Sequence, residues 1–380
     1  MRIAVAMDSF KGSLSSFDAG YAVKMGILQA DPAAQITVCP LADGGEGTVQ
    51  ALHSALGGQW LEVSVCGPLG NRVQAGYCIL PDGTALLEMA SAAGLPLVAP
   101  EKRNPLHTTT FGVGELIRSA IEQGCRNFIV GIGGSATNDG GTGMLSALGY
   151  EFLDCNGDPI APGAKGLAHL HRISNRHVLP ELSECRFRIA CDVKNPLCGE
   201  TGCSAVYAPQ KGATPDMIWD MDQWLNHYAH IAAKLSPKAD PNYPGAGAAG
   251  GLGFAFLTFT NAVLESGADI ILEQTGLEQQ IRDADMVITG EGRLDGQTAM
   301  GKGPMAVAAL AKQYGKPVIA LCGCIGEDAR RCNSHGIDAY FPILQSVTTL
   351  EDALQPESAK QNLTATATQV FRLIATFRRN

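Results

Sequence analysis

The stretch MVITGEGRLDGQTAMGKGPMAVAALAKQYG, residues 286–315, has the pattern of a strand, a glycine-rich loop and a helix. The apolar run Met286–Ile288 predicts a buried strand, and the apolar spacing after the loop predicts a helix. Residues 296–302 fit the first part of the phosphate-binding pattern G-x-x-x-x-G-K-[ST], but Gly303 stands where that pattern needs a hydroxyl to hold magnesium. We therefore predict that Lys302 binds phosphate at a helix start and that other residues hold the metal.

The N-terminal region repeats the alternation of strand and helix. Ile3–Met7 predicts a strand, Ser16 is a candidate cap for a helix to about residue 29, and Ile36–Cys39 predicts a second strand. The middle of the chain differs, because β-rich segments at 60–66, 73–80 and 84–89 surround a PDG turn. We predict an α/β protein with two α/β domains: a Rossmann-like doubly wound parallel sheet formed by both termini (residues 1–60 and 281–380) and an inserted second α/β domain (residues 61–280).

Composition excludes several classes of protein. The net charge of -9 argues against nucleic-acid binding, which needs an excess of Lys and Arg. No stretch has the length and apolar character of a signal peptide or a membrane helix. The 12 cysteines match no disulfide framework or zinc pattern, so we expect reduced thiols and a cytoplasmic protein.

Polar loops follow many of the predicted strands, and in open parallel sheets ligands bind at the carboxyl ends of strands. These loops hold seven carboxylates: Asp8, Asp43, Glu46, Asp139, Asp192, Glu291 and Asp295. Magnesium is usually bound through one or two carboxylates together with phosphate oxygens and water. We predict Asp192 and Asp139 as the metal ligands. Asp192 also comes directly after the apolar strand FRIAC, which makes it a candidate general base.

The loop GIGGSATNDGGTG, residues 131–143, is a candidate anion site. Glycines allow a ligand to approach the backbone, and oriented backbone amides bind anions. The predicted ligands are Gly131, Gly133, Gly134, Ser135, Thr137 and Asn138. A tight turn without a ligand is the structural alternative. The loop also fits the dinucleotide pattern G-x-G-x-x-A, although the sequence Asn-Asp-Gly-Gly interrupts the helix that this pattern requires.

Seven motifs in this order resemble the bacterial glycerate kinase family: DSFKGS, PLADGGEGT, GIGGSATNDGG, CDVKNPLCG, YAPQKGA, GAGAAGGLG and TGEGRLDGQT. The resemblance covers the chain from Met1 to about Leu344. It implies two α/β domains with the active site in the cleft between them, and transfer of the ATP γ-phosphate to glycerate with Mg²⁺ to give 2-phosphoglycerate.

The roles expected for individual residues follow from their chemistry in such a reaction. Lys11 or Arg293 would bind the glycerate carboxylate, Asp192 would orient or deprotonate the hydroxyl, and the 131–143 loop with Lys302 would bind the ATP phosphates.

The sequence leaves two other functions possible. An NAD-dependent hydroxyacid dehydrogenase would use the G-x-G-x-x-A match, and a noncatalytic organic-acid-binding sensor would bind its ligand without turnover. We expect ATP and glycerate as partners, no nucleic acid and no membrane, with a homo-oligomer as an open alternative to a monomer.

Overall fold

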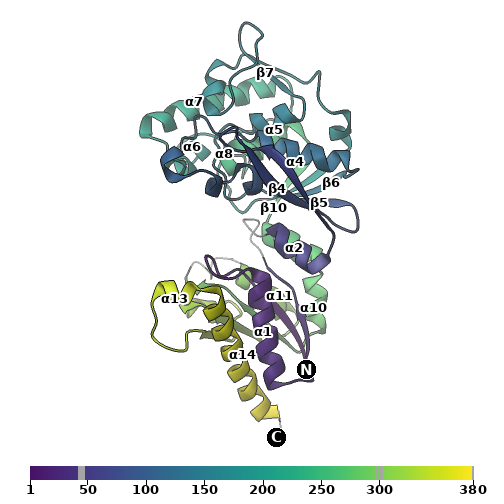
Figure 1. The fold of residues 1–380 in the computed structure, drawn as a ribbon, viewed down its shortest axis with the longest axis vertical. Helices are drawn as coiled ribbons and strands as arrows, with labels where there is room; N and C mark the ends of the chain where they lie inside the picture. The colour runs from purple at the N-terminus through teal and green to yellow at the C-terminus, as the bar shows by residue number, and fades with distance from the viewer. Residues whose placement is uncertain (42–47, 297, 299–302, 379–380) are drawn as a thin grey trace. The chain divides into compact units, whose positions relative to one another are not determined.

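The computed structural model describes residues 1–41, 48–296, 298 and 303–378 (Figure 1). Contacts divide the chain into two compact units. Unit 1 comprises Met1–Asp43, Gln50–Leu56 and Ala268–Asn380, and unit 2 comprises Gly44–Val49 and Gly57–Gly267. Both units are α/β, as the sequence predicts, and the boundaries differ from the predicted junctions at 60 and 280.

Unit 1 is built on a five-stranded sheet in the order β15-β13-β11-β1-β2, in which every neighbouring pair is parallel. The sheet is therefore assembled from both ends of the chain. Its strands are β1 (Arg2–Met7), β2 (Gln35–Val38), β11 (Met286–Gly290), β13 (Val318–Cys322) and β15 (Ala339–Pro342).

Helices cover both faces of this sheet because each strand alternates its side chains between them. On one face Ile3, Val5 and Met7 of β1 pack against α1 (Ser16–Ala30) and α14 (Pro356–Arg378), which lie side by side (Figure 1). On the other face Ala4 and Ala6 pack against α10 (Leu277–Asp283) and α11 (Gly303–Gln313). Such burial of both faces is what a parallel sheet requires.

Local details of unit 1 depart from the sequence prediction in two places. The cap of α1 is Ser15, whose side chain accepts the Asp18 N–H at 3.0 Å, and not Ser16, which is buried. The sequence also predicts a helix over residues 327–334, and the structure has only the short α12 (Arg331–Ser334) there. The remaining short elements are α2 (Thr48–Leu56), α9 (Gly267–Gln274), β12 (Arg293–Leu294), β14 (Cys324–Ile325) and α13 (Leu350–Leu354).

Unit 2 contains a six-stranded sheet in the order β10-β9-β6-β5-β4-β3. The first four strands in that order are parallel, and β4 pairs antiparallel with both β3 and β5. The hairpin region predicted around the PDG turn is therefore confirmed. The strands are β3 (Gln59–Cys66), β4 (Arg72–Ile79), β5 (Thr84–Glu88), β6 (Asn127–Gly131), β9 (Arg186–Ala190) and β10 (Ala262–Glu265), with a separate β7 (Glu151–Leu153) and β8 (Arg172–Ser174) pair.

The helices of unit 2 form one apolar core with the sheet, centred on Phe128, Phe187 and Phe256. They are α3 (Ala90–Ala93), α4 (Phe111–Glu122), α5 (Thr142–Ala147), α6 (Cys203–Tyr207), α7 (Pro215–Ala233) and α8 (Ala248–Phe259), with 3-10 helices at Leu95–Leu97, Pro100–Lys102, Ala164–His169, Pro180–Glu184 and Pro209–Lys211. None of the helices in the described part of the chain combines the length and the apolar character needed to cross a membrane. All 12 cysteines are unpaired.

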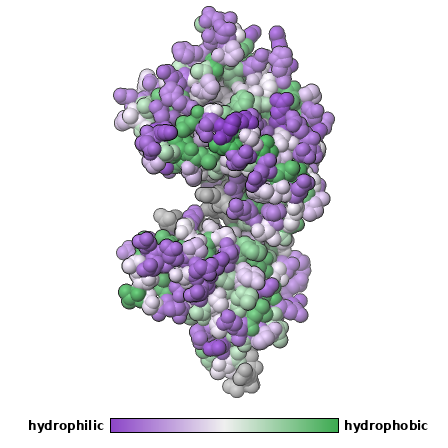
Figure 2. Space-filling view, in the orientation of Figure 1, coloured by the Kyte–Doolittle hydropathy of each residue, from purple (hydrophilic) through white to green (hydrophobic). Residues whose placement is uncertain are grey.

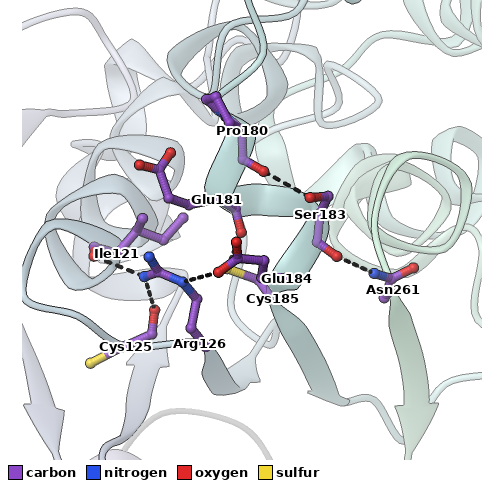
Figure 3. Close-up of polar contacts among 9 residues, drawn as sticks. All are labelled: Ile121, Cys125, Arg126, Pro180, Glu181, Ser183, Glu184, Cys185 and Asn261. Carbon is purple, nitrogen blue, oxygen red and sulfur yellow. Dashed lines mark hydrogen bonds and ion pairs between the residues drawn. The ribbon is translucent and has the colours of Figure 1, made fainter.

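Arg126 connects three segments at the amino ends of the unit 2 strands (Figure 3). Its guanidinium donates to the carbonyls of Ile121 and Cys125, at the end of α4, and to the Glu184 carboxylate at 3.1 Å. Nearby, the Asn261 side chain donates to the Ser183 carbonyl at 3.1 Å. The Ile121 carbonyl also accepts the Gly124 N–H at 2.9 Å, so Arg126 adds a second, charged donor to this carbonyl and joins it to the Cys125 carbonyl and the Glu184 carboxylate.

We expect Arg126→Ala to lower the free energy of unfolding of unit 2 by about 1–3 kcal/mol, because two carbonyls lose a charged donor. Urea denaturation followed by circular dichroism measures this change. Arg118→Ala is the matched control, since Arg118 lies on α4, whose end Arg126 contacts, and forms an exposed pair with Glu122, worth roughly 0.3–0.5 kcal/mol. Equal losses in the two variants would contradict the role given to Arg126.

Candidate active site

The sheet of unit 1 has a topological switch point between β1 and β11. From β1 the chain continues through α1 to β2 in one direction, and from β11 it continues through α11 to β13 in the other. The two helices lie on opposite faces of the sheet. Ligands of open α/β sheets bind in the crevice at such a point, outside the carboxyl ends of the strands.

Two buried carboxylates, Asp8 and Glu291, follow neighbouring strands at the switch point. Met7 pairs with Gly290, so Asp8 and Glu291 each come one residue after the last paired residues of neighbouring strands. The Asp8 N–H donates to the Gly290 carbonyl at 2.8 Å, which continues the ladder by one bond. Asp8 is 7% exposed and Glu291 is 8% exposed. Acidic residues usually lie on the surface, so the burial of two of them at the carboxyl ends of neighbouring strands is unusual.

Local donors orient both carboxylates. The Ser9 N–H donates to Asp8 Oδ1 at 2.6 Å, and the buried Thr298 hydroxyl donates to Glu291 Oε1 at 2.6 Å. Thr298 is also hydrogen-bonded with Asp295, through its own N–H at 3.3 Å and through the Asp295 N–H at 3.1 Å. The two acidic side chains are thus held in place by the loops that carry them.

A cavity of about 660 Å³ lies at the carboxyl ends of the unit 1 strands. It is lined by Asp8, Lys11, Glu291, Arg293 and Asp295, among others. The structure therefore brings together two of the predicted site residues, Lys11 and Arg293. Arg293 Nε lies 3.3 Å from Asp295 Oδ2, and its side chain is 65% exposed. The cavity has accessible cations of the kind that bind phosphate or carboxylate groups, and beside them carboxylates of the kind that bind divalent metal ions.

Gly303 begins α11 and also lines the cavity. A Cβ placed on Gly303 would lie 3.4 Å from Asp8 Oδ2, so the helix start faces the Asp8 carboxylate. Lys302, the predicted phosphate ligand, lies outside the described residues, as do Asp43 and Glu46.

The glycine-rich loop predicted to bind anions belongs to unit 2, where most of its polar side chains are buried. Ser135 is 7% exposed, while Thr137 and Asn138 are 0% exposed. Asn138 Nδ2 donates to Ser204 Oγ at 2.9 Å. These positions favour an internal structural role for the three side chains. Gly131 ends β6, and Gly133 and Gly134 follow it in the more accessible part of the loop.

Lys211, a basic residue of a polar loop for which the sequence predicted no role, binds the 131–143 loop from the interior of unit 2. It is 2% exposed, and its ammonium group donates to Ser135 Oγ at 2.8 Å and to the Thr137 carbonyl at 2.6 Å. Burial lowers the pKa of Lys211 to about 8. Its sequence context, YAPQKGA, is a polar turn that contains no signal of burial.

Asp139, a predicted metal ligand, is completely buried and saturated with donors. Oδ2 accepts hydrogen bonds from the Thr110 N–H and hydroxyl, both at 2.8 Å, and from the Gly143 N–H at 3.3 Å. Oδ1 accepts from the Gly141 N–H at 3.1 Å. Burial raises the pKa of Asp139, and these donors oppose the rise. A carboxylate has about four acceptor sites, so the structure favours Asp139 as an anchor of the loop over a metal ligand.

Close contact with the 131–143 loop explains the glycines of the motif GAGAAGGLG, residues 245–253. Gly250 has φ +66°, and a Cβ there would lie 2.1 Å from the Thr137 carbonyl oxygen. The Gly140 N–H donates to the Gly250 carbonyl at 2.9 Å. The glycines therefore allow the start of α8 to touch the loop backbone.

Asp192, the predicted base and metal ligand, follows β9 and is exposed. Its Oδ1 accepts the Gly267 N–H at 3.1 Å. The register aligns Glu88, Gly131, Ala190 and Glu265 across the carboxyl edge of this sheet. Glu265 forms a two-point ion pair with Arg188 at 2.9 and 2.6 Å. No group of three or more His, Cys, Asp or Glu side chains in the described ranges is arranged to bind a metal.

A model of the glycerate kinase family matches residues 3–375. The chain belongs to the glycerate kinase family. It is 48% identical over 376 residues to "Glycerate kinase" of Haemophilus influenzae, with 99% of each chain covered. It is 45% identical over 381 residues to "Glycerate 2-kinase" of Escherichia coli K12, with 100% of each chain covered. These matches confirm the resemblance to the glycerate kinase family that the seven motifs indicate.

A solved structure of the same family shares the fold. The crystal structure of a protein from Salmonella typhimurium LT2 that is assigned as glycerate kinase 2 aligns with a TM-score of 0.91, 45% identity and 100% coverage of both chains. As a member of this family, the chain is an ATP-dependent kinase with an alcohol group as phosphate acceptor.

The buried Lys211 predicts a specific pH dependence of stability. Its pKa is about 8 in the folded protein against 10.5 for an exposed lysine. Between these values the unfolded chain binds the proton and the folded chain does not, so stability rises with pH. We expect the wild type to gain free energy of unfolding relative to Lys211→Met as the pH increases from 8 to 10.

Urea denaturation of both proteins at several pH values measures this difference. Lys165→Met serves as the control, because Lys165 is an exposed lysine of the same unit. A constant difference between the wild type and Lys211→Met across this pH range would show that Lys211 keeps its charge when buried.

Proposed function

We propose that this protein transfers the γ-phosphate of ATP to D-glycerate, giving 2-phosphoglycerate and ADP with the assistance of Mg²⁺. Family membership over residues 3–375 supports the phosphate donor and the acceptor class, and the name glycerate 2-kinase of a relative with 45% identity supports the regiochemistry. The observation that carries the proposal in this chain is the switch-point cavity with its adjacent buried carboxylates. The unpaired cysteines support a cytoplasmic location.

Lys11 and Arg293 are the proposed partners of the glycerate carboxylate. Both line the cavity, and the guanidinium of Arg293, on β12, pairs with Asp295. A guanidinium can donate two parallel hydrogen bonds to one carboxylate, which fixes the orientation of a small acid better than a point charge. This fixed orientation determines which hydroxyl faces the phosphate donor.

Asp8 and Glu291 are the proposed ligands of Mg²⁺ in place of the Asp139 and Asp192 pair expected from the sequence. Their oxygens are the hard donors that this ion prefers, and it needs only one or two carboxylates when phosphates and water complete its coordination. When bound, the ion would offset negative charge on the phosphoryl oxygens. Hydrogen bonds from Ser9 and Thr298 fix the positions of the two carboxylates in the chain itself.

The remaining roles stay predictions. Asp192 is proposed to orient or deprotonate the reacting hydroxyl, which its exposed position after β9 allows. The backbone of Gly131, Gly133 and Gly134 stays a candidate phosphate contact. An active site between the two domains also stays a prediction. Membership of a kinase family argues against the dehydrogenase and the sensor.

An assay of ADP release with purified protein, ATP, magnesium and D-glycerate tests the function. We expect glycerate-dependent ADP formation, a product that nuclear magnetic resonance identifies as 2-phosphoglycerate, and loss of activity when EDTA removes the metal. Formation of 3-phosphoglycerate would overturn the regiochemistry, and binding of glycerate without ADP release would favour the sensor.

We expect Arg293→Lys to raise the KM for glycerate by about 10-fold or more while the KM for ATP changes little, because an ammonium replaces a two-point contact with one. Steady-state kinetics with each substrate varied in turn provides the measurement. The control is Arg331→Lys, since Arg331 is an exposed arginine of the same unit that pairs with Asp328. A shift in the KM for ATP alone would assign Arg293 to the nucleotide.

A further inference from the structure

The lining of the unit 1 cavity changes from charged to apolar along the sheet edge. Asp8 and Glu291 lie after the interior strands β1 and β11, whereas Ile343 and Leu344 lie after β15, which is an edge strand of the sheet. Leu350 and Leu354 of α13, the helix that follows these residues in the chain, line the same cavity. We call these four residues, Ile343, Leu344, Leu350 and Leu354, the apolar wall.

The cavity is larger than glycerate needs. From β1 to β15 the sheet spans three strand spacings, or about 14 Å at the usual 4.8 Å per strand. The volume of about 660 Å³ lies in the range of sites for ligands much larger than a three-carbon acid. Glycerate bound by Lys11 and Arg293 would occupy the charged end and leave the apolar wall without an occupant.

Three leucines of the apolar wall are partly exposed to solvent. Leu350 is 75% exposed, Leu344 is 40% exposed and Leu354 is 37% exposed. Figure 1 shows α13 beside α14 in this unit, and Figure 2 shows hydrophobic surface among hydrophilic residues in the same part of the view. Exposed leucines that line a cavity, with a charged region at its other end, are typical of a site for an amphipathic ligand.

The segment that carries the leucines is fixed at its start. The Thr349 hydroxyl accepts the Asp352 N–H at 3.2 Å and donates to the Asp352 carboxylate at 2.7 Å, which caps α13. The buried Ala359 of α14 also lines the cavity, and its small side chain leaves space beside the leucines. Hydrogen bonds within the chain therefore hold the start of α13, which carries two of the four residues of the apolar wall.

We propose that the apolar wall binds the adenine ring of ATP, with the phosphates directed along the sheet edge toward Asp8 and Glu291. A nucleoside triphosphate is the ligand that combines a flat apolar ring with a polyanion, and this order of groups matches the order of side chains along the cavity. This proposal rests on ATP as the phosphate donor of the proposed function. It gives the base a binding site, which the sequence prediction did not assign.

Binding of Mg-ADP and of magnesium pyrophosphate, measured by titration calorimetry, separates the ring from the phosphates. Leu350→Asp and Leu354→Asp should each weaken Mg-ADP binding by about 10-fold or more, the loss expected when burial of an apolar group is replaced by contact with a charge. Pyrophosphate binding should change less than about 2-fold, a free-energy difference below 0.5 kcal/mol.

Val347→Asp is the matched control, because Val347 is fully exposed, adjoins the same helix and does not line the cavity. It should leave Mg-ADP binding unchanged. If an aspartate variant fails to fold, Leu350→Ala and Leu354→Ala should still weaken Mg-ADP binding in the same direction.

Three results would overturn the proposal. They are unchanged Mg-ADP affinity in all leucine variants, equal losses for Mg-ADP and pyrophosphate, and a change of oligomeric state with unchanged Mg-ADP affinity, which would make the apolar wall a contact between subunits. Failure of the glycerate kinase assay would not be confused with these results, because the binding measurement requires no turnover.

Discussion

The parallel pairing of β1 with β11 is the constraint on which the rest of unit 1 depends. Five residue pairs, from Ile3 with Met286 to Met7 with Gly290, join strands from opposite ends of the chain. Because both strands point the same way, the loops that leave them emerge at one edge, and their helices cover opposite faces. A slip of one residue in this register would move Asp8 away from Glu291 and would turn the buried side chains of β1 to the wrong face.

The two units use polar residues at their strand ends in different ways. In unit 1 the loops after β1 and β11 leave Lys11 and Arg293 accessible around a cavity. In unit 2 the loop after β6 turns its polar side chains inward, where Asp139 accepts from Thr110 and Lys211 donates to the Thr137 carbonyl. Burying both charged groups is unfavourable without partners. The hydrogen bonds to Lys211 and Asp139 offset that penalty and fix the loop in one conformation.

Strand and helix patterns in the sequence predicted the α/β class and the hairpin of unit 2, because periodicity and turn residues are local signals. The site was harder to predict. Asp8 and Glu291 were recognised as loop carboxylates, but their adjacency depends on strand order, which no local pattern contains. Asp139 was predicted as a metal ligand because it lies in a loop that follows a strand, but the glycines of that loop permit close packing that buries it, as at Gly250. The burial of Lys211 depends on segments distant in sequence.

The central claim is that the switch point of unit 1 is the catalytic end of the protein, and Asp8→Asn tests it most directly. This substitution keeps the size of the side chain and removes the charge beside Glu291. Its kcat with saturating ATP, magnesium and glycerate should fall by roughly 10²-fold or more, as expected when a group that stabilises the transition state is lost. Circular dichroism should show an unchanged fold. A folded Asp8→Asn protein with a kcat near that of the wild type would contradict the account.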